Sequence, residues 1–224
     1  AVESAEPRAG AGTSDGSATT LRTLQTPCLV LDAERMERNV ARLRGRLDRL
    51  GVTLRPHLKT AKSVEVARRV MRSPQGPATV STLQEADRFA AAGVRDMIYA
   101  VGIAPAKLAR VLELRATGVD LAVVLDTPEQ AQAVAAYSRT AGARIPALIE
   151  IDCDGHRSGV APQDVERLLA IGHALVQGAE LRGVLTHAGG SYGARGADAQ
   201  ARAEALAQCA EVERASVVDA ATIL

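Results

Sequence analysis

The chain has 224 residues, and its 27 Lys and Arg against 26 Asp and Glu give a formal net charge of +1. It has no Trp and one Phe, and no basic run is interleaved with aromatic residues, which argues against a nucleic-acid-binding surface. No apolar run approaches the roughly 20 residues of a membrane span. We therefore expect neither nucleic acid nor a membrane as a partner.

Three cysteines, Cys28, Cys153 and Cys209, lie far apart and show no CxxC spacing. Such a set indicates reduced thiols in a cytoplasmic protein rather than a disulfide framework or a zinc site. Residues 1–23 are small, polar and rich in Gly, which predicts a disordered tail before a domain over residues 24–224.

From Thr26 onward, short apolar runs alternate with helical patterns. The apolar runs are residues 28–32, 52–59, 78–83, 96–102, 120–126, 146–152 and 181–189, and the helical patterns follow at 34–50, 63–72, 84–93, 105–118, 127–142, 162–176 and 198–222. Gly93, Gly118 and Gly142 end three of these patterns, as a left-handed C-cap prefers. Thr127 and Pro128 suit the N-cap and first turn of another helix.

Alternating strands and helices predict an α/β fold with a parallel sheet, either doubly wound or a (β/α)₈ TIM-type barrel. No GxGxxG follows the first apolar run, and seven regular units favour the barrel. A closed barrel needs an eighth strand, which we expect beyond residue 224. The alternative is that the units are miscounted and the barrel closes in another way.

One expected strand, "VTLRPHLK" at residues 52–59, carries Arg55, His57 and Lys59 at alternate positions. In a barrel this period of two would turn all three toward the lumen, with Lys59 at the carboxyl-end mouth where barrel enzymes place their chemistry. A lysine there is a candidate for a Schiff base. The alternative for Arg55 is a buried ion-pair network with Glu150 and Asp152. Lys62, the competing nucleophile, falls past the strand, and we interpret it as solvated or phosphate-facing.

Two further polar stretches follow later strands. "DCDGHRSGV" at residues 152–160 offers Arg157 as a fixed cation, and "THAGGSYG" at residues 186–193 offers backbone amides, Ser191 and Tyr192 as an anion cradle. Loops after strands seven and eight often bind phosphate in barrels. We therefore expect both stretches to join Lys59 at one mouth.

Together, "TPCLVLD", "RPHLKT", "HRSGV" and "THAGGSYG" resemble the fold-type III pyridoxal-phosphate (PLP) enzymes. The closer resemblance is to the branch that holds D-threonine aldolase and D-serine dehydratase. It implies that Lys59 binds PLP covalently and acts as a base, and that Arg157 faces the cofactor ring. It also implies cofactor-binding roles for His57, Thr82, His187 and Tyr192.

The resemblance implies a lyase for D-3-hydroxy amino acids, of the D-serine or D-threo-3-hydroxyaspartate dehydratase type. The alternatives are a D-threonine aldolase and a non-catalytic PLP-binding barrel. Members of the branch add a phosphate loop after the eighth strand and a β-rich domain with a divalent metal, Zn or Mn. We expect those elements, including every metal ligand, beyond residue 224, and we expect a homodimer for the full-length protein.

Overall fold

The computed structural model describes residues 20–224, so most of the predicted tail lies outside the described residues. The chain divides into two compact units, Ala1–Arg42 and Leu43–Leu224. Helix α1 (Ala33–Arg49) begins after Asp32, whose carboxylate accepts the amide of Arg35 at 2.9 Å. The strand predicted at residues 28–32 is wrong, because those residues have no strand and Leu29 is fully exposed. A strand needs a neighbouring strand for its backbone groups, and the described part of this unit contains none.

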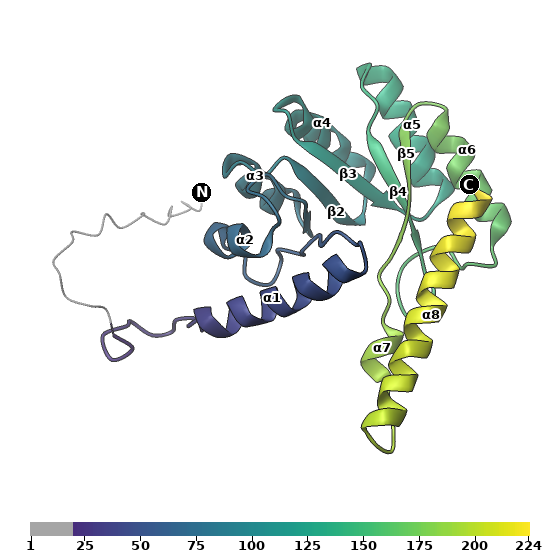
Figure 1. Ribbon diagram of the computed structural model, residues 1–224. Helices are drawn as coiled ribbons and strands as arrows, with labels where there is room; N and C mark the ends of the chain where they lie inside the picture. The colour runs from purple at the N-terminus through teal and green to yellow at the C-terminus, as the bar shows by residue number, and fades with distance from the viewer. Residues whose placement is uncertain (1–19) are drawn as a thin grey trace. The chain divides into compact units, whose positions relative to one another are not determined.

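The second unit is built on a five-stranded parallel sheet (Figure 1). Its strands are β1 (Ala78–Val80), β2 (Asp96–Gly102), β3 (Asp120–Leu125), β4 (Pro146–Ile151) and β5 (Glu180–Thr186). Each strand pairs with the next one in the chain, in the order β1-β2-β3-β4-β5. A doubly wound sheet reverses its strand order at a switch point, whereas a β/α barrel keeps sequence order. The predicted α/β class is therefore confirmed, and the strand order is that of the barrel.

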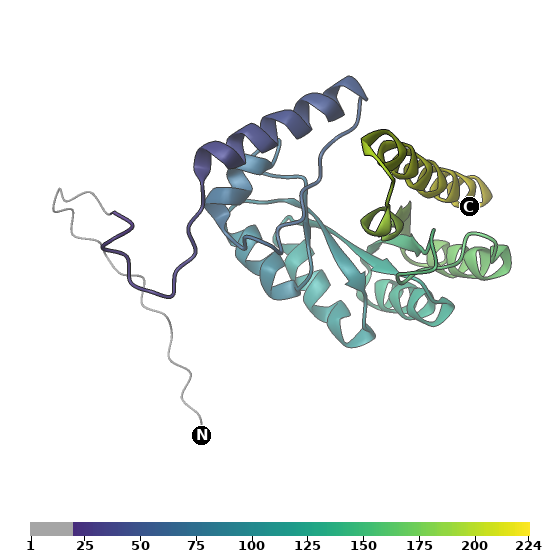
Figure 2. The same ribbon diagram turned by 90° about the horizontal axis from the view of Figure 1, so that it is seen from below.

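The predicted helical patterns all form helices, and the short helix α7 was not predicted. After α1, the helices are α2 (Val64–Val70), α3 (Leu83–Ala91), the 3₁₀ turn η1 (Pro105–Lys107) with α4 (Leu108–Ala116), α5 (Pro128–Ala141), α6 (Val165–Val176), α7 (Gly190–Gly193) and α8 (Ala199–Ile223). Helices α3 to α6 line one side of the sheet (Figure 2). At the start of α5, Thr127 and Gln130 form the capping box that fixes its first turn. Gly142 ends the same helix with a φ of 65°, as predicted.

The core lies between the sheet and these helices. Strand β3 is buried from Leu121 to Leu125, and Ile149 and Ile151 of β4 are almost fully inaccessible. Near-continuous burial is typical of parallel strands covered on both faces. Strand β5 is only partly buried, and α8 packs on it and on α6 near the buried Ala220. Within residues 20–224, no helix combines the length and apolarity needed to cross a membrane.

The run at residues 52–59 is not a regular strand, which corrects the prediction. It joins the edge of the sheet through one parallel bridge between His57 and Thr79. The amide of Thr79 donates to Pro56 O and the amide of Leu58 donates to Thr79 O, both at 2.9 Å. Pro56 has no N–H to extend the ladder. The run therefore occupies the place of a strand beside β1 with a single bridge.

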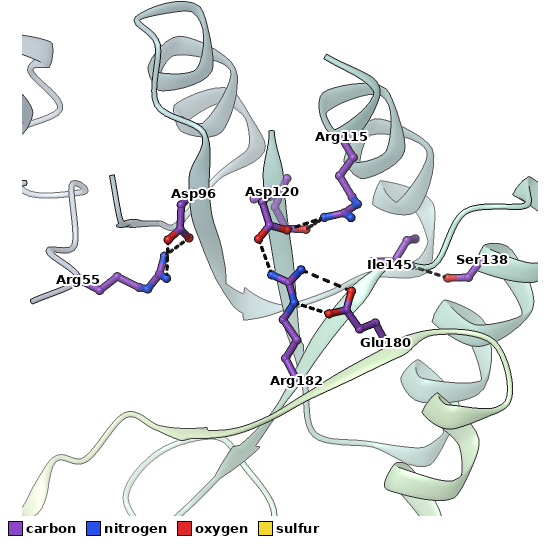
Figure 3. A network of polar contacts seen from close by, with 9 residues as sticks. Arg55, Asp96, Arg115, Asp120, Ser138, Ile145, Glu180 and Arg182 are labelled. Atoms are coloured by element: carbon purple, nitrogen blue, oxygen red, sulfur yellow. Dashed lines mark hydrogen bonds and ion pairs between the residues drawn. The ribbon is translucent and has the colours of Figure 1, made fainter. Parts of the chain in front are cut away.

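Charged residues pair at the amino ends of the strands (Figure 3). The guanidinium of Arg55 bonds both oxygens of Asp96, the first residue of β2, at 2.6 and 3.0 Å. Both expectations for Arg55 are thus corrected: its guanidinium lies at the amino end of β2 rather than in the lumen with Lys59, and its ion-pair partner is Asp96 rather than Glu150 or Asp152. The contact ties the run at residues 52–59 to the start of β2.

Arg182 joins the charged residues at the amino ends of the strands because β5 has a bulge at this position. Leu181 pairs with Ala147 and Gly183 pairs with Leu148, so Arg182 has no partner in the ladder. A bulge re-aims the side chain of the extra residue. The guanidinium of Arg182 reaches Asp120 of β3 at 2.7 Å and Glu180 at 2.9 Å, and Arg115 bonds the other oxygen of Asp120 at 3.0 Å (Figure 3).

We predict that Arg182→Met destabilises the protein at neutral pH and much less in acid. Hydrogen bonds from Arg182, and then from Arg115, hold the pKa of Asp120 below its ordinary value of 3.8. A lowered carboxyl pKa adds stability above the unfolded-state value, and this stability is lost as the pH falls through the folded-state pKa. Asp120 is 46% exposed, so solvent screening limits the effect to about 1 kcal/mol.

Urea unfolding of the wild type and the variant at pH 7 and near pH ~3 measures this difference. The matched control is Arg214→Met, which breaks an exposed pair with Glu211 on α8 and should change stability less. A stability difference for Arg182→Met that is as large in acid as at pH 7 contradicts the prediction.

Candidate functional site

A cavity of about 400 Å³ opens at the carboxyl ends of the strands, where barrel enzymes hold their substrates. Its lining residues are Ala100, Val101, Gly102, Glu150, His156, Arg157, Ser158 and His187. They come from the ends of β2 and β4 and from the segments that follow β4 and β5. The volume suits a small ligand, and a cation, a carboxyl group and two imidazoles face it.

Arg157 and His187 meet across this cavity, as the sequence predicted for the two loops. Nη2 of Arg157 lies 2.8 Å from Nε2 and 3.1 Å from Nδ1 of His187. Burial first, then the charges of Arg157 and Lys59, lower the pKa of His187, against a smaller opposing effect of Asp154. A guanidinium this close requires a neutral imidazole that accepts, so His187 presents no positive charge of its own at neutral pH.

His57 stands beside Lys59 and fixes its backbone. The amide of Lys59 donates to Nδ1 of His57 at 3.3 Å, and Nε2 lies 3.2 Å from Oγ of Ser81. Burial and the charge of Lys59 lower the pKa of His57. Because Nδ1 accepts, the proton of the neutral ring lies on Nε2 and points at Ser81.

The charge of Lys59 connects these two histidines. It lowers the pKa of His57 and that of His187, so the ammonium lies within electrostatic reach of both rings. Of the six predicted site residues, the structure thus joins His57 to Lys59 and Arg157 to His187 by hydrogen bonds, and the charge of Lys59 links the two pairs.

Thr82 and Tyr192 take other positions. Thr82 caps α3 by accepting the amide of Glu85 at 3.0 Å, directly after Ser81. Tyr192 lies on α7 with 75% of its surface exposed. Lys62 is ion-paired with the buried Glu85 at 3.3 Å, so it is less available as a nucleophile than the sequence indicated.

The predicted anion cradle at residues 189–190 already holds an anion of this chain. The amides of Gly189 and Gly190 both donate to Oδ2 of Asp154. A phosphate at these amides would have to displace that carboxylate. The expectation that this turn, with Ser191 and Tyr192, grips an external anion stays a prediction.

Sequence reasoning missed Ser81 and Asp154, and it named Glu150 only as a partner for Arg55. Ser81 contacts His57 from the end of β1, Asp154 joins the two loops, and Glu150 lines the cavity with 9% of its surface exposed. Burial first, then the nearby carboxylates of Asp126 and Asp152, raise the pKa of Glu150 against the effect of Arg157. An acidic residue inside the apolar run "ALIEI" was the available signal for Glu150.

No group of three or more His, Cys, Asp or Glu side chains in residues 20–224 is arranged to hold a metal ion. The groups that line the cavity are Arg157, two imidazoles and the carboxyl group of Glu150. The permanent cation Arg157 suits an anionic group of a ligand.

The family described as alanine racemase, N-terminal domain, matches residues 31–221, and the chain belongs to it. The predicted family is thereby confirmed. Among curated proteins, the chain is 50% identical to D-threo-3-hydroxyaspartate dehydratase of Delftia sp. (strain HT23), over 92% of this chain and 53% of that protein. It is 34% identical to D-threonine aldolase of Arthrobacter sp., over 67% of this chain and 40% of that protein.

Solved structures give the same relationship. D-threo-3-hydroxyaspartate dehydratase from Delftia sp. HT23 superposes with a TM-score of 0.86 at 49% identity, covering 92% of this chain and 53% of that one. D-threonine aldolase from Filomicrobium marinum gives a TM-score of 0.70 at 28% identity, covering 89% of this chain and 54% of that one. The chain thus spans about half the length of the relatives that it matches.

Proposed function

We propose that this chain is the cofactor-binding part of a PLP-dependent lyase that acts on D-3-hydroxy amino acids. The proposed reaction is the dehydratase type, as for D-serine or D-threo-3-hydroxyaspartate. The observation that carries the proposal is the contact of Arg157 with His187 at the carboxyl-end cavity. Lys59, whose amide bonds His57, lies near enough for its charge to lower the pKa of both histidines. The 50% identity to a D-threo-3-hydroxyaspartate dehydratase supports the choice of reaction.

The residues present fit PLP in charge. Lys59 supplies a primary amine for covalent attachment, and Arg157 places a permanent cation at a cavity of about 400 Å³. When bound, PLP supplies the electron sink for charge that develops at the substrate's α-carbon. The amides of Gly189 and Gly190 are not assigned to its phosphate, because Asp154 occupies them.

Each residue then has a defined role. Lys59 holds the cofactor and, when its amine is free, moves the α-proton at Nζ. His57 positions Lys59 by accepting its backbone amide, while Arg157 stays charged beside the neutral His187 and faces the cofactor ring. We propose Thr82 and Tyr192 as further cofactor contacts on the resemblance of their motifs.

A divalent metal, Zn or Mn, completes the proposal. A related D-threo-3-hydroxyaspartate dehydratase has been solved as a mutant in a metal-free form, which supports a metal in that protein. In this protein the ion would assist departure of the 3-hydroxyl group as a Lewis acid, bound by ligands outside residues 20–224.

We also propose a cytoplasmic protein that assembles as a homodimer. The three cysteines, Cys28, Cys153 and Cys209, are all free thiols, which supports a reducing compartment. The substrate is a small D-amino acid, and no nucleic-acid partner is part of the proposal.

D-Threonine separates the reactions when it is given to the protein expressed from the whole gene. We expect 2-oxobutanoate and ammonia, with L-threonine as the control that is not turned over. Glycine and acetaldehyde instead would show the aldolase, which the D-threonine aldolase relatives keep as the second candidate. Cofactor binding without turnover of any D-amino acid would show the non-catalytic barrel.

A further inference from the structure

The carboxylate of Asp154 accepts three backbone amides from two different loops. Its Oδ2 accepts the amides of Gly189 at 2.7 Å and Gly190, while Oδ1 accepts the amide of His156 at 3.1 Å. The carboxyl side chain is only 14% exposed. Amide hydrogen bonds from Gly189 and Gly190 hold its pKa below the ordinary value, so it is an anion at neutral pH.

These contacts join two loops that are far apart in sequence. Asp154 follows β4, whereas Gly189 and Gly190 follow β5, some 35 residues later. The stem of Arg157 runs along Gly189, because a Cβ at Gly189 would lie 3.6 Å from Cγ and Cδ of Arg157. The head of Arg157 then meets His187.

We propose that Asp154 is a positioning residue, which ties the loop after β4 to the loop after β5 and so sets Arg157 against His187. The role rests on the proposed function, since Arg157 and His187 are its site residues. Asp154 itself does not line the cavity that they share. It acts through the two loops rather than by touching a ligand.

Asp154→Asn tests the role because one amide oxygen cannot replace two carboxylate oxygens. Asn has a single acceptor oxygen and an NH₂ group, so either the Gly189–Gly190 pair or His156 would face a donor. Asp164 offers the matched control. It caps α6 by accepting one amide, that of Arg167, at 3.1 Å, and Asn caps a helix about as well as Asp.

The pKa of His187, followed by NMR of histidine-labelled protein from the whole gene without added cofactor, gives the decisive readout. Arg157 and Lys59 lower this pKa, Asp154 raises it, and the neighbouring His57 is also within range. If Asp154 acts only as a nearby charge, its removal lowers the pKa of His187. If it positions Arg157, the contact opens and the pKa rises toward 6.5.

We therefore expect Asp154→Asn to raise the pKa of His187 and Asp164→Asn to leave it unchanged. Arg157→Gln should raise it as well, and the double variant with Asp154→Asn should add little to either change. If Asp154→Asn does not fold, Asp154→Ser is titrated in its place, since it keeps one hydroxyl acceptor. A lowered or unchanged pKa of His187 overturns the proposal.

Activity provides a second test. Misplaced site groups reduce kcat/KM by a factor on the order of 100, and we expect this loss for Asp154→Asn but not for Asp164→Asn. Wild-type activity in Asp154→Asn would overturn the positioning role. If the wild type turns over no D-amino acid, the proposed function fails, and the titration of His187 still decides the role of Asp154.

Discussion

Lys59→Ala is expected to abolish covalent PLP binding and to remove essentially all lyase activity. The substitution deletes the only amine that the site presents beside His57 and His187 among the described residues. Loss of a positioned acid–base group alone lowers the rate by about 10²–10⁴-fold, and loss of the covalent attachment adds to that. The measurements are the visible absorbance band of lysine-bound PLP and the turnover of a D-3-hydroxy amino acid.

Lys62→Ala is the matched control for Lys59→Ala, because it removes a lysine three residues further along the same loop. Lys62 pairs with Glu85 at 3.3 Å, and the charge that lowers the pKa of His57 and His187 is that of Lys59, not of Lys62. We expect this variant to keep the absorbance band and most of the activity. A Lys59→Ala protein that retains the band, or a Lys62→Ala protein that loses it, would move the covalent attachment away from Lys59.

The regular part of the fold could be predicted because local patterns agree with the final contacts. Five apolar runs became β1 to β5, and the Thr127 capping box and the Gly142 cap lie where the sequence placed them. These features depend on a few neighbouring residues. The sequence order of the strands follows from the same alternation of strand and helix.

The two expected strands that failed are the two that precede β1 in the chain. Residues 28–32 are apolar enough for a strand, yet they have no strand in the structure, and residues 52–59 make a single bridge to Thr79. A strand is a property of a pair. A local sequence pattern does not show whether a neighbouring strand is present to pair with. Both runs were therefore predicted as strands although neither forms a regular one.

The site divides along similar lines. Period-two alternation correctly placed His57 near Lys59 at the carboxyl end, but the same alternation did not predict that Arg55 pairs with Asp96 at the amino end. Whether a side chain lies near Lys59 or pairs at the amino end depends on its position along the run, and not on the face to which it points. Asp154 was missed because its partners are backbone amides of Gly189 and Gly190, which no side-chain motif reveals.

Gly159→Ala is expected to displace the loop that carries Arg157 and to destabilise the protein strongly. Gly159 has a φ of +133°, and a Cβ there would lie 2.4 Å from N of Asp152 and 2.6 Å from C of Ile151. These are backbone atoms that cannot rotate away. The loop closes at this point through the bonds from Val160 N to Glu150 O at 2.8 Å and from Asp152 N to Val160 O at 3.0 Å.

Backbone strain of about 1–3 kcal/mol and overpacking of about 1–3 kcal/mol together predict a loss of about 2–6 kcal/mol for Gly159→Ala. Urea unfolding measures this loss, and cofactor binding measures the accompanying displacement of Arg157. Gly155→Ala is the control in the same loop. Gly155 has a φ of +71° with nothing near its Cβ position, so we expect only the left-handed penalty of about 1–2 kcal/mol.

A larger loss at Gly159 than at Gly155 therefore reports the close approach of the chain to itself, not the sign of φ. The closure that makes Gly159 necessary also brings its amide to Asp126 at 3.1 Å and bridges Val160 to Ile151 of β4. Equal losses at the two glycines would mean that the loop has room to move. In that case Arg157 could not be held against His187 by this loop, and the Asp154 contacts would have to position it alone.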